Sequence, residues 1–246
     1  MTPQPQVHGV LFDIDETLVD LQAAMGTTLR TLAEQDLPHF TETDWAVYQA
    51  LFAADPQGFY DQYLAGELSF AEQRIRRLQH AQVSSGLPEL DDDAAEAWNA
   101  TYESVLPRHF QAFDDVVPLL DELDARGIPY GAVSNNVHDY QRAKLDAAGL
   151  QRIGVLVGID TVGVAKPDPA IFLEGARLLG TEPAQTFYVG DNRRVDAEGA
   201  ADAGLRGVWL DRPGNPSPVR SEADARPLQG ISRIGSLMEV IGLVGA

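Results

Sequence analysis

The apolar run Val10–Phe12 is followed at once by two carboxylates one residue apart, Asp13 and Asp15. Such a run is typical of a buried strand, and because burying charge is costly, we expect the acids at the strand's carboxyl end, where α/β folds hold ligands. Strand alternation predicts that both side chains point the same way and that Ile14 points to the opposite face. The pair can share a metal ion or divide the roles of nucleophile and general acid. The alternative is a solvated loop in which the acids cap the following helix.

Three further polar groups come after apolar runs. They are Ser134 and Asn135 after 128–133, Lys166 after 155–159, and Asp191 with Asp196 after 186–189. Taken singly, most of these groups do not indicate a functional site, because Ser, Asn and Asp are favoured in turns and at helix starts. Lys166 is more informative, since Lys144 is the only other lysine in the sequence.

In this order, the four groups resemble the sequence motifs of the haloacid dehalogenase (HAD) superfamily of phosphotransferases, over nearly the whole chain. The resemblance implies that Asp13 is the nucleophile and forms an aspartyl phosphate. It implies that Asp15 protonates the departing alkoxide and then takes a proton from the water that hydrolyses the intermediate. Lys166 would neutralise charge on the phosphoryl group and on Asp13.

The substrate-binding residues implied by the resemblance are Thr17, Ser134, Asn135 and Lys166. Ser134 and Asn135 would donate hydrogen bonds to phosphoryl oxygens, and their alternative is an ordinary strand-to-helix turn. The Thr17 hydroxyl either holds two loops in register or satisfies its own turn. The alternative for Lys166 is a surface lysine before the helix start at 167–169.

The implied cofactor is Mg²⁺, held by Asp13, the backbone carbonyl of Asp15, and Asp191. This ion prefers one or two carboxylates together with water and substrate phosphate, which agrees with that set. Asp196 stands at the family's second acidic position. Three roles are open for it: binding the metal through water, holding Lys166 in place, or stabilising the first turn of a helix.

The elements that must position these residues alternate, from Ile128 onward, between apolar runs and helical patterns, as βαβ units do. The predicted helices are 137–148, 169–179 and 194–203, and a fifth strand is predicted over 207–210. Short crossovers of this kind predict a parallel sheet with right-handed connections. Together with the resemblance, this gives an α/β fold class, with a Rossmann-like three-layer α/β/α core.

Residues 21–106 have a different pattern. They lack buried-strand runs and contain four or five amphipathic helical stretches, for example 70–83 and 93–106. An all-helical insertion after the first strand is similar to the helical cap of one HAD subclass, which sits over the site and selects the leaving group. The expected division is a core domain of 1–20 and 107–246 and a cap domain of 21–106.

The amino-acid composition limits the classes of molecule that this protein could bind. With 18 Lys and Arg against 37 Asp and Glu, the 246 residues carry a formal charge of -19. This charge disfavours a nucleic-acid polymer but not a small phosphorylated metabolite, which local groups would bind. The absence of cysteine excludes disulfides, thiolate metal sites and Cys nucleophiles. No stretch approaches the roughly 18 apolar residues of a membrane span, so we expect no membrane partner and a cytoplasmic monomer or homodimer.

The resulting prediction is a Mg²⁺-dependent phosphatase that hydrolyses a small phosphomonoester. Two alternatives stay open: a sugar-phosphate mutase on the same fold, and a non-catalytic phosphate-binding module. Asp15 argues against haloacid dehalogenation, because a halide leaving group needs no proton. A phosphonatase that forms a Schiff base with a cap lysine is excluded, since 21–106 contains no lysine. Glu16 and Asn136 depart from the commonest family pattern, in which glycine is frequent at both positions.

Overall fold

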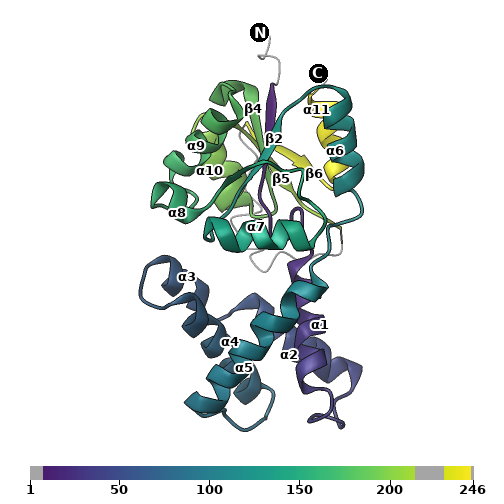
Figure 1. Cartoon of the computed structure of the whole chain (residues 1–246), viewed down its shortest axis with the longest axis vertical. Coiled ribbons are helices and arrows are strands. Elements are labelled where there is room, and N and C mark those ends of the chain that lie inside the picture. The colour runs from purple at the N-terminus through teal and green to yellow at the C-terminus, as the bar shows by residue number, and fades with distance from the viewer. Residues whose placement is uncertain (1–7, 214–229, 245–246) are drawn as a thin grey trace. The chain divides into compact units, whose positions relative to one another are not determined.

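The computed structural model describes residues 8–213 and 230–244 of the chain (Figure 1). The chain forms two compact units, which we call the core unit (1–20 with 111–246) and the helical unit (21–110). Within the described ranges, no helix is both long enough and apolar enough to cross a membrane.

The core unit is built on a parallel six-stranded sheet with the strand order β3-β2-β1-β4-β5-β6. Its strands are β1 (Gly9–Phe12), β2 (Tyr130–Val133), β3 (Val155–Val157), β4 (Thr186–Gly190), β5 (Arg206–Leu210) and β6 (Ser232–Ile234). The first five lie in the predicted runs. The edge strand β6 was not predicted, because only Ile234 of its three residues is buried and no apolar run marks it.

Helices cover both faces of this sheet. They are α6 (Val116–Ala125), α7 (His138–Ala147), α8 (Ile159–Val162), α9 (Pro169–Leu179), α10 (Gly199–Asp202) and α11 (Val240–Val244). Figure 1 shows α9 and α10 on one side of the sheet and α6 with α11 on the other. The predicted three-layer α/β/α core is therefore confirmed. The predicted helix over 194–203 is interrupted, since a π-helical turn, η3 (Arg193–Glu198), precedes α10.

The centre of the core unit is apolar and close-packed. All four residues of β1 are buried, as expected for a central strand of a parallel sheet covered on both faces. Leu11 packs with Val133 and Tyr188 of the neighbouring strands and with Phe172 of α9. A Cβ on Gly175 would lie only 2.7 Å from Leu11 Cδ1, so this glycine allows α9 to approach the sheet closely.

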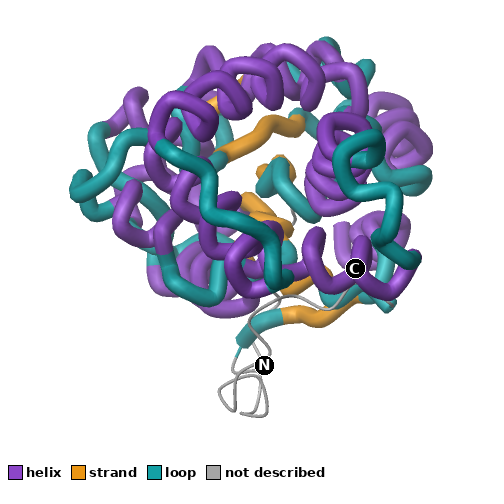
Figure 2. Tube along the Cα trace, turned by 90° about the horizontal axis from the view of Figure 1, so that it is seen from below, coloured by secondary structure: helices purple, strands orange, loops and turns teal. Residues whose placement is uncertain are grey.

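The helical unit contains α1 (Leu21–Ala33), α2 (Glu42–Ala54), α3 (Phe59–Leu64), α4 (Phe70–Ser84), α5 (Asp92–Val105) and the 3₁₀ turn η1 (Leu106–His109). The strands drawn in orange in Figure 2 all belong to the core unit. The helical unit extends to Phe110 rather than to the expected 106, because η1 packs against α1 of the same unit.

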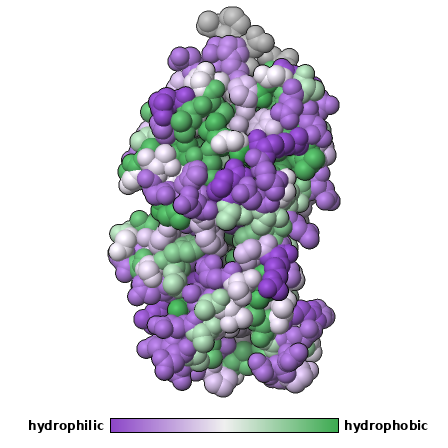
Figure 3. All heavy atoms as spheres, in the orientation of Figure 1, coloured by the Kyte–Doolittle hydropathy of each residue, from purple (hydrophilic) through white to green (hydrophobic). Residues whose placement is uncertain are grey.

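Charged and polar residues dominate the surface that Figure 3 displays, as the acidic composition leads one to expect. Large apolar side chains that are exposed in the described residues are Val47, Val83, Val117, Val137, Leu173, Leu178 and Met238. They are distributed over several different helices and loops. Single exposed apolar residues of this kind are normal on a protein surface.

Candidate active site

The candidate site lies at the carboxyl edge of the sheet. Asp13 follows β1, Ser134 follows β2 and Asp191 follows β4. These strands are neighbours in the sheet, with β1 between β2 and β4. Because parallel strands end at the same edge, residues that are far apart in the sequence meet there.

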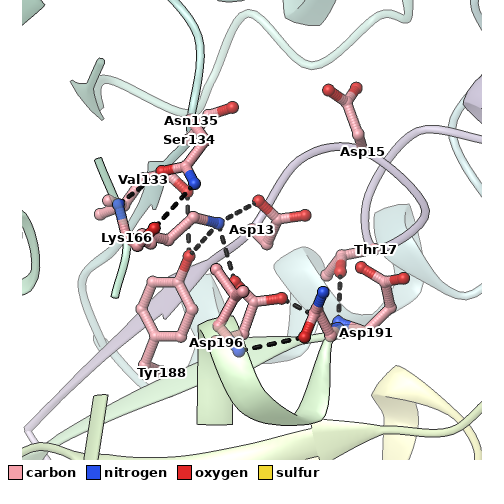
Figure 4. A network of polar contacts seen from close by, with 12 residues as sticks. Asp13, Asp15, Thr17, Val133, Ser134, Asn135, Lys166, Tyr188, Asp191 and Asp196 are labelled. Carbon is pink, nitrogen blue, oxygen red and sulfur yellow. Dashed lines mark hydrogen bonds and ion pairs between the residues drawn. The ribbon is translucent and has the colours of Figure 1, made fainter. Parts of the chain in front are cut away.

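A buried lysine lies at the centre of this site. The Lys166 ammonium donates to Asp13 Oδ1 at 2.5 Å, to Asp196 Oδ1 at 2.8 Å and to the Tyr188 hydroxyl oxygen at 2.9 Å (Figure 4). The Tyr188 hydroxyl in turn donates to the Val133 carbonyl at 3.0 Å. The structure thus brings together the predicted residues Asp13, Lys166 and Asp196.

Burial and charge act on these groups in opposite directions. Burial raises the pKa of Asp13 to about 7, with Asp196 and Asp15 also raising it and Lys166 opposing them. Burial alone would lower the pKa of Lys166, but the carboxylates of Asp13 and Asp196 raise it well above its ordinary value. Lys166 is therefore a fixed cation in a site where water does little to screen charge.

Three carboxylates share this region. One oxygen each of Asp13, Asp191 and Asp196 lies within 4.8 Å of the others. Burial raises the pKa of Asp191 well above its ordinary value, and repulsion from Asp196, Asp13 and Glu16 adds to this effect. One lysine leaves this set with an excess of negative charge, which a divalent cation would offset. All the donors are oxygens, the ligand type that Mg²⁺ prefers.

The loop after β4 is shaped around Asp196. Asp196 Oδ2 accepts from the Asn192 backbone N–H at 3.0 Å, so both of its carboxylate oxygens have partners. A Cβ on Gly190 would lie 2.4 Å from Asp196 Cγ, so only glycine leaves room for that carboxylate. The fully buried Thr17 hydroxyl accepts from the Asp191 N–H at 3.1 Å and links the β1 loop to the β4 loop. Of the two roles considered for Thr17, the structure shows the link between loops.

The loop after β2 has a similar link to the lysine. The side-chain amide of Asn135 donates to the Lys166 carbonyl at 3.0 Å and accepts from the Lys166 N–H at 2.6 Å. This pair of bonds fixes the backbone that carries the lysine. Ser134, also buried, accepts at its hydroxyl from Gln141 Nε2 at 2.6 Å. That both residues donate to phosphoryl oxygens stays a prediction.

Asp15 lies beyond the end of the strand on which the expectation of strand alternation rests. β1 ends at Phe12, and Glu16, with φ 62°, takes the left-handed conformation that favours glycine. The chain therefore turns at this point instead of continuing as a strand. In Figure 4 no contact joins the Asp15 carboxylate to Asp13, Lys166 or Asp196. Its partners are Gln141 and Lys144 of α7. That the carboxylates of Asp13 and Asp15 point the same way stays a prediction.

Three residues around the site were not predicted from the sequence. Tyr188 holds Lys166, and the α7 residues Gln141 and Lys144 hold Asp15. Tyr188 stands within an apolar run, where only the general need of a buried tyrosine for a hydrogen-bond partner gives a signal. Gln141, Lys144 and the buried Leu145 share one face of α7. Two polar residues on a helix face that also carries a buried leucine could have indicated a functional role from the sequence.

The sequence model of the haloacid dehalogenase-like hydrolase family matches residues 7–204. The chain belongs to this family.

Three of the similar proteins, all with phosphatase names, illustrate the relationship. Phosphoserine phosphatase of Thermus thermophilus is 34% identical over 158 residues, which cover 64% of this chain and 59% of that protein. Glyceraldehyde 3-phosphate phosphatase of Methanopyrus kandleri is 30% identical, covering 84% of each chain. Phosphoglycolate phosphatase of Xanthomonas campestris is 30% identical, covering 88% of this chain and 90% of that protein.

Solved structures of the family share the fold. The magnesium-bound HAD-hydrolase YfnB of Bacillus subtilis has a TM-score of 0.74 at 22% identity, covering 98% of this chain and 100% of that chain. The L-2-haloacid dehalogenase of Xanthobacter autotrophicus has a TM-score of 0.70 at 20% identity, covering 98% and 99%. The family prediction made from the four motifs is confirmed.

Proposed function

We propose that this chain is a Mg²⁺-dependent phosphatase that hydrolyses a small phosphomonoester through an aspartyl phosphate at Asp13. The observation that carries the proposal is the buried Lys166 ammonium, 2.5 Å from Asp13 and 2.8 Å from Asp196 within a cluster of carboxylates. Phosphoryl transfer needs an in-line nucleophile, positive charge on the phosphoryl oxygens and a proton for the leaving group. The site contains candidates for all three.

In the first half-reaction, the Asp13 carboxylate attacks phosphorus while the bond from phosphorus to the ester oxygen breaks. The electrons of that bond pass to the departing oxygen, which takes a proton from Asp15. Lys166 stabilises the negative charge on the phosphoryl oxygens, and the Ser134 hydroxyl donates to one of them.

In the second half-reaction, Asp15 is a carboxylate and removes a proton from a water molecule. The water oxygen attacks phosphorus, and the bond from phosphorus to Asp13 breaks and restores the Asp13 carboxylate. The products are inorganic phosphate and the alcohol. Lys166 compensates for the charge on Asp13 at both ends of this cycle.

Asp13, Asp191 and the Asp15 backbone carbonyl would hold Mg²⁺. When bound, the ion supplies further positive charge to the phosphoryl oxygens. Both carboxylate oxygens of Asp196 are already hydrogen-bonded, to Lys166 and to the Asn192 N–H. For this reason we assign Asp196 the task of holding Lys166, with the metal as a nearby charge.

A small phosphorylated metabolite is the proposed substrate. Relatives at 30–34% identity are named for phosphoserine, glyceraldehyde 3-phosphate and phosphoglycolate, all small phosphomonoesters. The likeness to dehalogenase structures, at 20% identity for the Xanthobacter enzyme, concerns the fold. Dehalogenation would leave Asp15 without a task. We also propose, from the family resemblance, that the helical unit serves as the cap domain.

The test is the release of phosphate from p-nitrophenyl phosphate with added Mg²⁺ and with a chelator. The expected result is turnover by the wild type that the chelator abolishes, and a loss of at least about 10³-fold in Asp13→Asn. Asp114→Asn, which changes an exposed aspartate of the core unit, serves as the matched control and should keep full activity. Turnover by Asp13→Asn at the wild-type rate would contradict the proposal.

A further inference from the structure

The second lysine of the chain is buried as well. Lys144 lies on α7 with 2% of its surface exposed, and its ammonium forms an ion pair with Asp15 Oδ1. An ammonium group that leaves water needs compensation from an opposite charge or from hydrogen bonds. Here that compensation comes from a residue to which the proposed reaction gives both proton transfers.

Gln141 lies one helical turn before Lys144 and is fully buried. Its side-chain Nε2 donates to Asp15 Oδ2 at 3.2 Å and to the Ser134 hydroxyl oxygen at 2.6 Å. Residues three apart share one face of a helix. Each oxygen of the Asp15 carboxylate therefore has its own partner on α7, and the Gln141 amide connects this carboxylate to Ser134.

This arrangement is not the one that stability alone favours. Among the described residues, Gln141 Oε1 is a buried oxygen with no hydrogen-bond partner, and an unpaired buried acceptor is destabilising. A buried ion pair is likewise a weak source of stability compared with apolar residues of similar volume. The two polar side chains therefore point to a task other than packing.

The placement of the Asp15 partners agrees with that task. In-line transfer places the attacking and leaving oxygens on opposite sides of phosphorus. A carboxyl group that serves the leaving oxygen must therefore stand apart from the nucleophile Asp13. The Asp15 carboxylate does so, because its partners are on α7 and no contact joins it to Asp13 in Figure 4.

We propose that Lys144 and Gln141 are positioning residues that hold the Asp15 carboxylate, through one oxygen each, in the orientation its proton transfers require. This inference rests on the proposed phosphatase function. Without these partners the Asp15 side chain rotates freely about its bonds and loses its fixed relation to Ser134. Loss of this fixed orientation slows the proton-transfer steps, whereas the nucleophile and the metal ligands stay in place.

Two esters of similar shape separate this role from a structural one. Phenyl phosphate has a leaving group that needs a proton, whereas 2,4-dinitrophenyl phosphate has one that leaves as a stable anion. The variants are Lys144→Met, Gln141→Leu and, as a reference for the loss of the acid, Asp15→Asn. The control is Arg142→Met, which removes a cation from the same helix without contact to Asp15.

For phenyl phosphate, we expect kcat/KM to fall about 100-fold in Lys144→Met and in Gln141→Leu. For 2,4-dinitrophenyl phosphate, kcat/KM should change by no more than about threefold, because the first half-reaction then needs no acid. The second half-reaction still needs Asp15 as a base, so a pre-steady-state burst of dinitrophenolate should appear in both variants. Arg142→Met should behave as the wild type with both esters.

An equal loss of kcat/KM for both esters, or no loss for either, would overturn the inference while wild-type turnover upholds the phosphatase function. Mg²⁺ binding at wild-type affinity, measured by calorimetry, shows that a variant is folded. If Lys144→Met fails this criterion, the comparison of the two esters rests on Gln141→Leu alone. This variant keeps the ion pair between Lys144 and Asp15. A wild type that hydrolyses neither ester would overturn the phosphatase function and this inference together.

Discussion

Lys166 is held by oxygen atoms from three different segments: the β1 loop, β4 and the π-helical turn η3. Two of these atoms belong to carboxylates and the third to the Tyr188 hydroxyl. Burial raises the pKa of Tyr188 well above its ordinary value, so the hydroxyl stays protonated and donates to the Val133 carbonyl. Tyr188 thus positions the lysine without adding charge.

This role predicts a measurable defect in Tyr188→Phe. The variant loses the hydrogen bonds to Lys166 and to the Val133 carbonyl, and we expect the free energy of unfolding to fall by about 1–3 kcal/mol. Phosphate release should slow by about tenfold, the equivalent of about 1.4 kcal/mol, since Lys166 keeps both carboxylates. Urea unfolding and steady-state kinetics measure the two effects.

Tyr130→Phe is the matched control, because Tyr130 lies on β2 of the same sheet and its hydroxyl bonds only to Asp124 among the contacts described. It should retain wild-type activity and lose no more than about 0.5 kcal/mol of stability. Equal activity losses in the two variants would show that the hydroxyl of Tyr188 has no special relation to Lys166.

At the scale of elements, Asp115 ties together segments that lie far apart in the sequence. Its carboxylate accepts from Arg212 at 2.8 and 2.9 Å, from the Ser236 hydroxyl at 2.8 Å and from the Leu237 N–H at 2.9 Å. Arg212 also donates to the Thr17 carbonyl at 3.0 Å. The start of α6, the end of β5 and the turn before α11 are thereby fixed to the β1 loop.

The pH dependence of stability follows from this carboxylate. Burial raises the pKa of Asp115, but Arg212, the Leu237 N–H and Ser236 together bring it below the ordinary value of 3.8. A group with a lowered folded-state pKa stabilises the fold above its unfolded pKa and loses this contribution as the pH falls through the folded value. The stabilisation is therefore complete at pH 7 and disappears below about pH 4.

Asp115→Asn should accordingly unfold more easily at pH 7, by about 2–3 kcal/mol, and its difference from the wild type should shrink as the pH falls below about 4. Urea unfolding across this pH range measures the difference. The neighbouring exposed residue gives the control Asp114→Asn, for which we expect a change within about 0.5 kcal/mol. A difference that grows in acid would contradict the assigned role of Asp115.

The sequence predicted the elements better than the contacts between them. Apolar runs marked the strands β1 to β5, and the order of polar residues after them indicated Asp13, Ser134, Lys166 and Asp191. β6 was not predicted because only Ile234 of its three residues is buried, so no apolar run marks it.

The partners of individual side chains could not be predicted from the sequence, because they lie far apart along the chain. Lys144 is 129 positions from Asp15 along the chain, and nothing local relates the two. No local pattern marks Gly190 either, since its close packing against Asp196 arises only in the folded chain. Pattern and propensity fix local structure, but the pairing of distant side chains depends on the packed fold.

At the scale of the whole molecule, a chain with a formal charge of -19 gathers three aspartates around one lysine. This excess of negative charge opposes folding of the core unit in the absence of a cation. We therefore expect Mg²⁺ to stabilise the protein, with the midpoint of thermal unfolding rising by about 5 °C at a concentration of about 100 Kd. Asp191→Asn should lose this response, whereas Asp202→Asn, which changes an exposed residue of α10, should keep it.

The same site predicts how Mg²⁺ affinity depends on pH. Burial raises the pKa of Asp13 to about 7 in the metal-free protein, so a proton competes with the ion below that value. Mg²⁺ affinity should rise as the pH increases through about 7, as calorimetry at a series of pH values would show. A Mg²⁺ affinity that falls over this pH range would contradict the assignment of these aspartates to a metal. So would a midpoint of thermal unfolding that does not change when Mg²⁺ is added.

The most direct test of the proposed aspartyl phosphate at Asp13 is to trap this covalent intermediate. During turnover of 2,4-dinitrophenyl phosphate with Mg²⁺, borohydride reduces an aspartyl phosphate to an alcohol, and peptide mass spectrometry locates the reduced residue. We expect reduction at Asp13 only while substrate is turned over, and stronger labelling in Asp15→Asn, where hydrolysis of the intermediate is slow. Turnover without any reduced residue, or with the label on another residue, would contradict it.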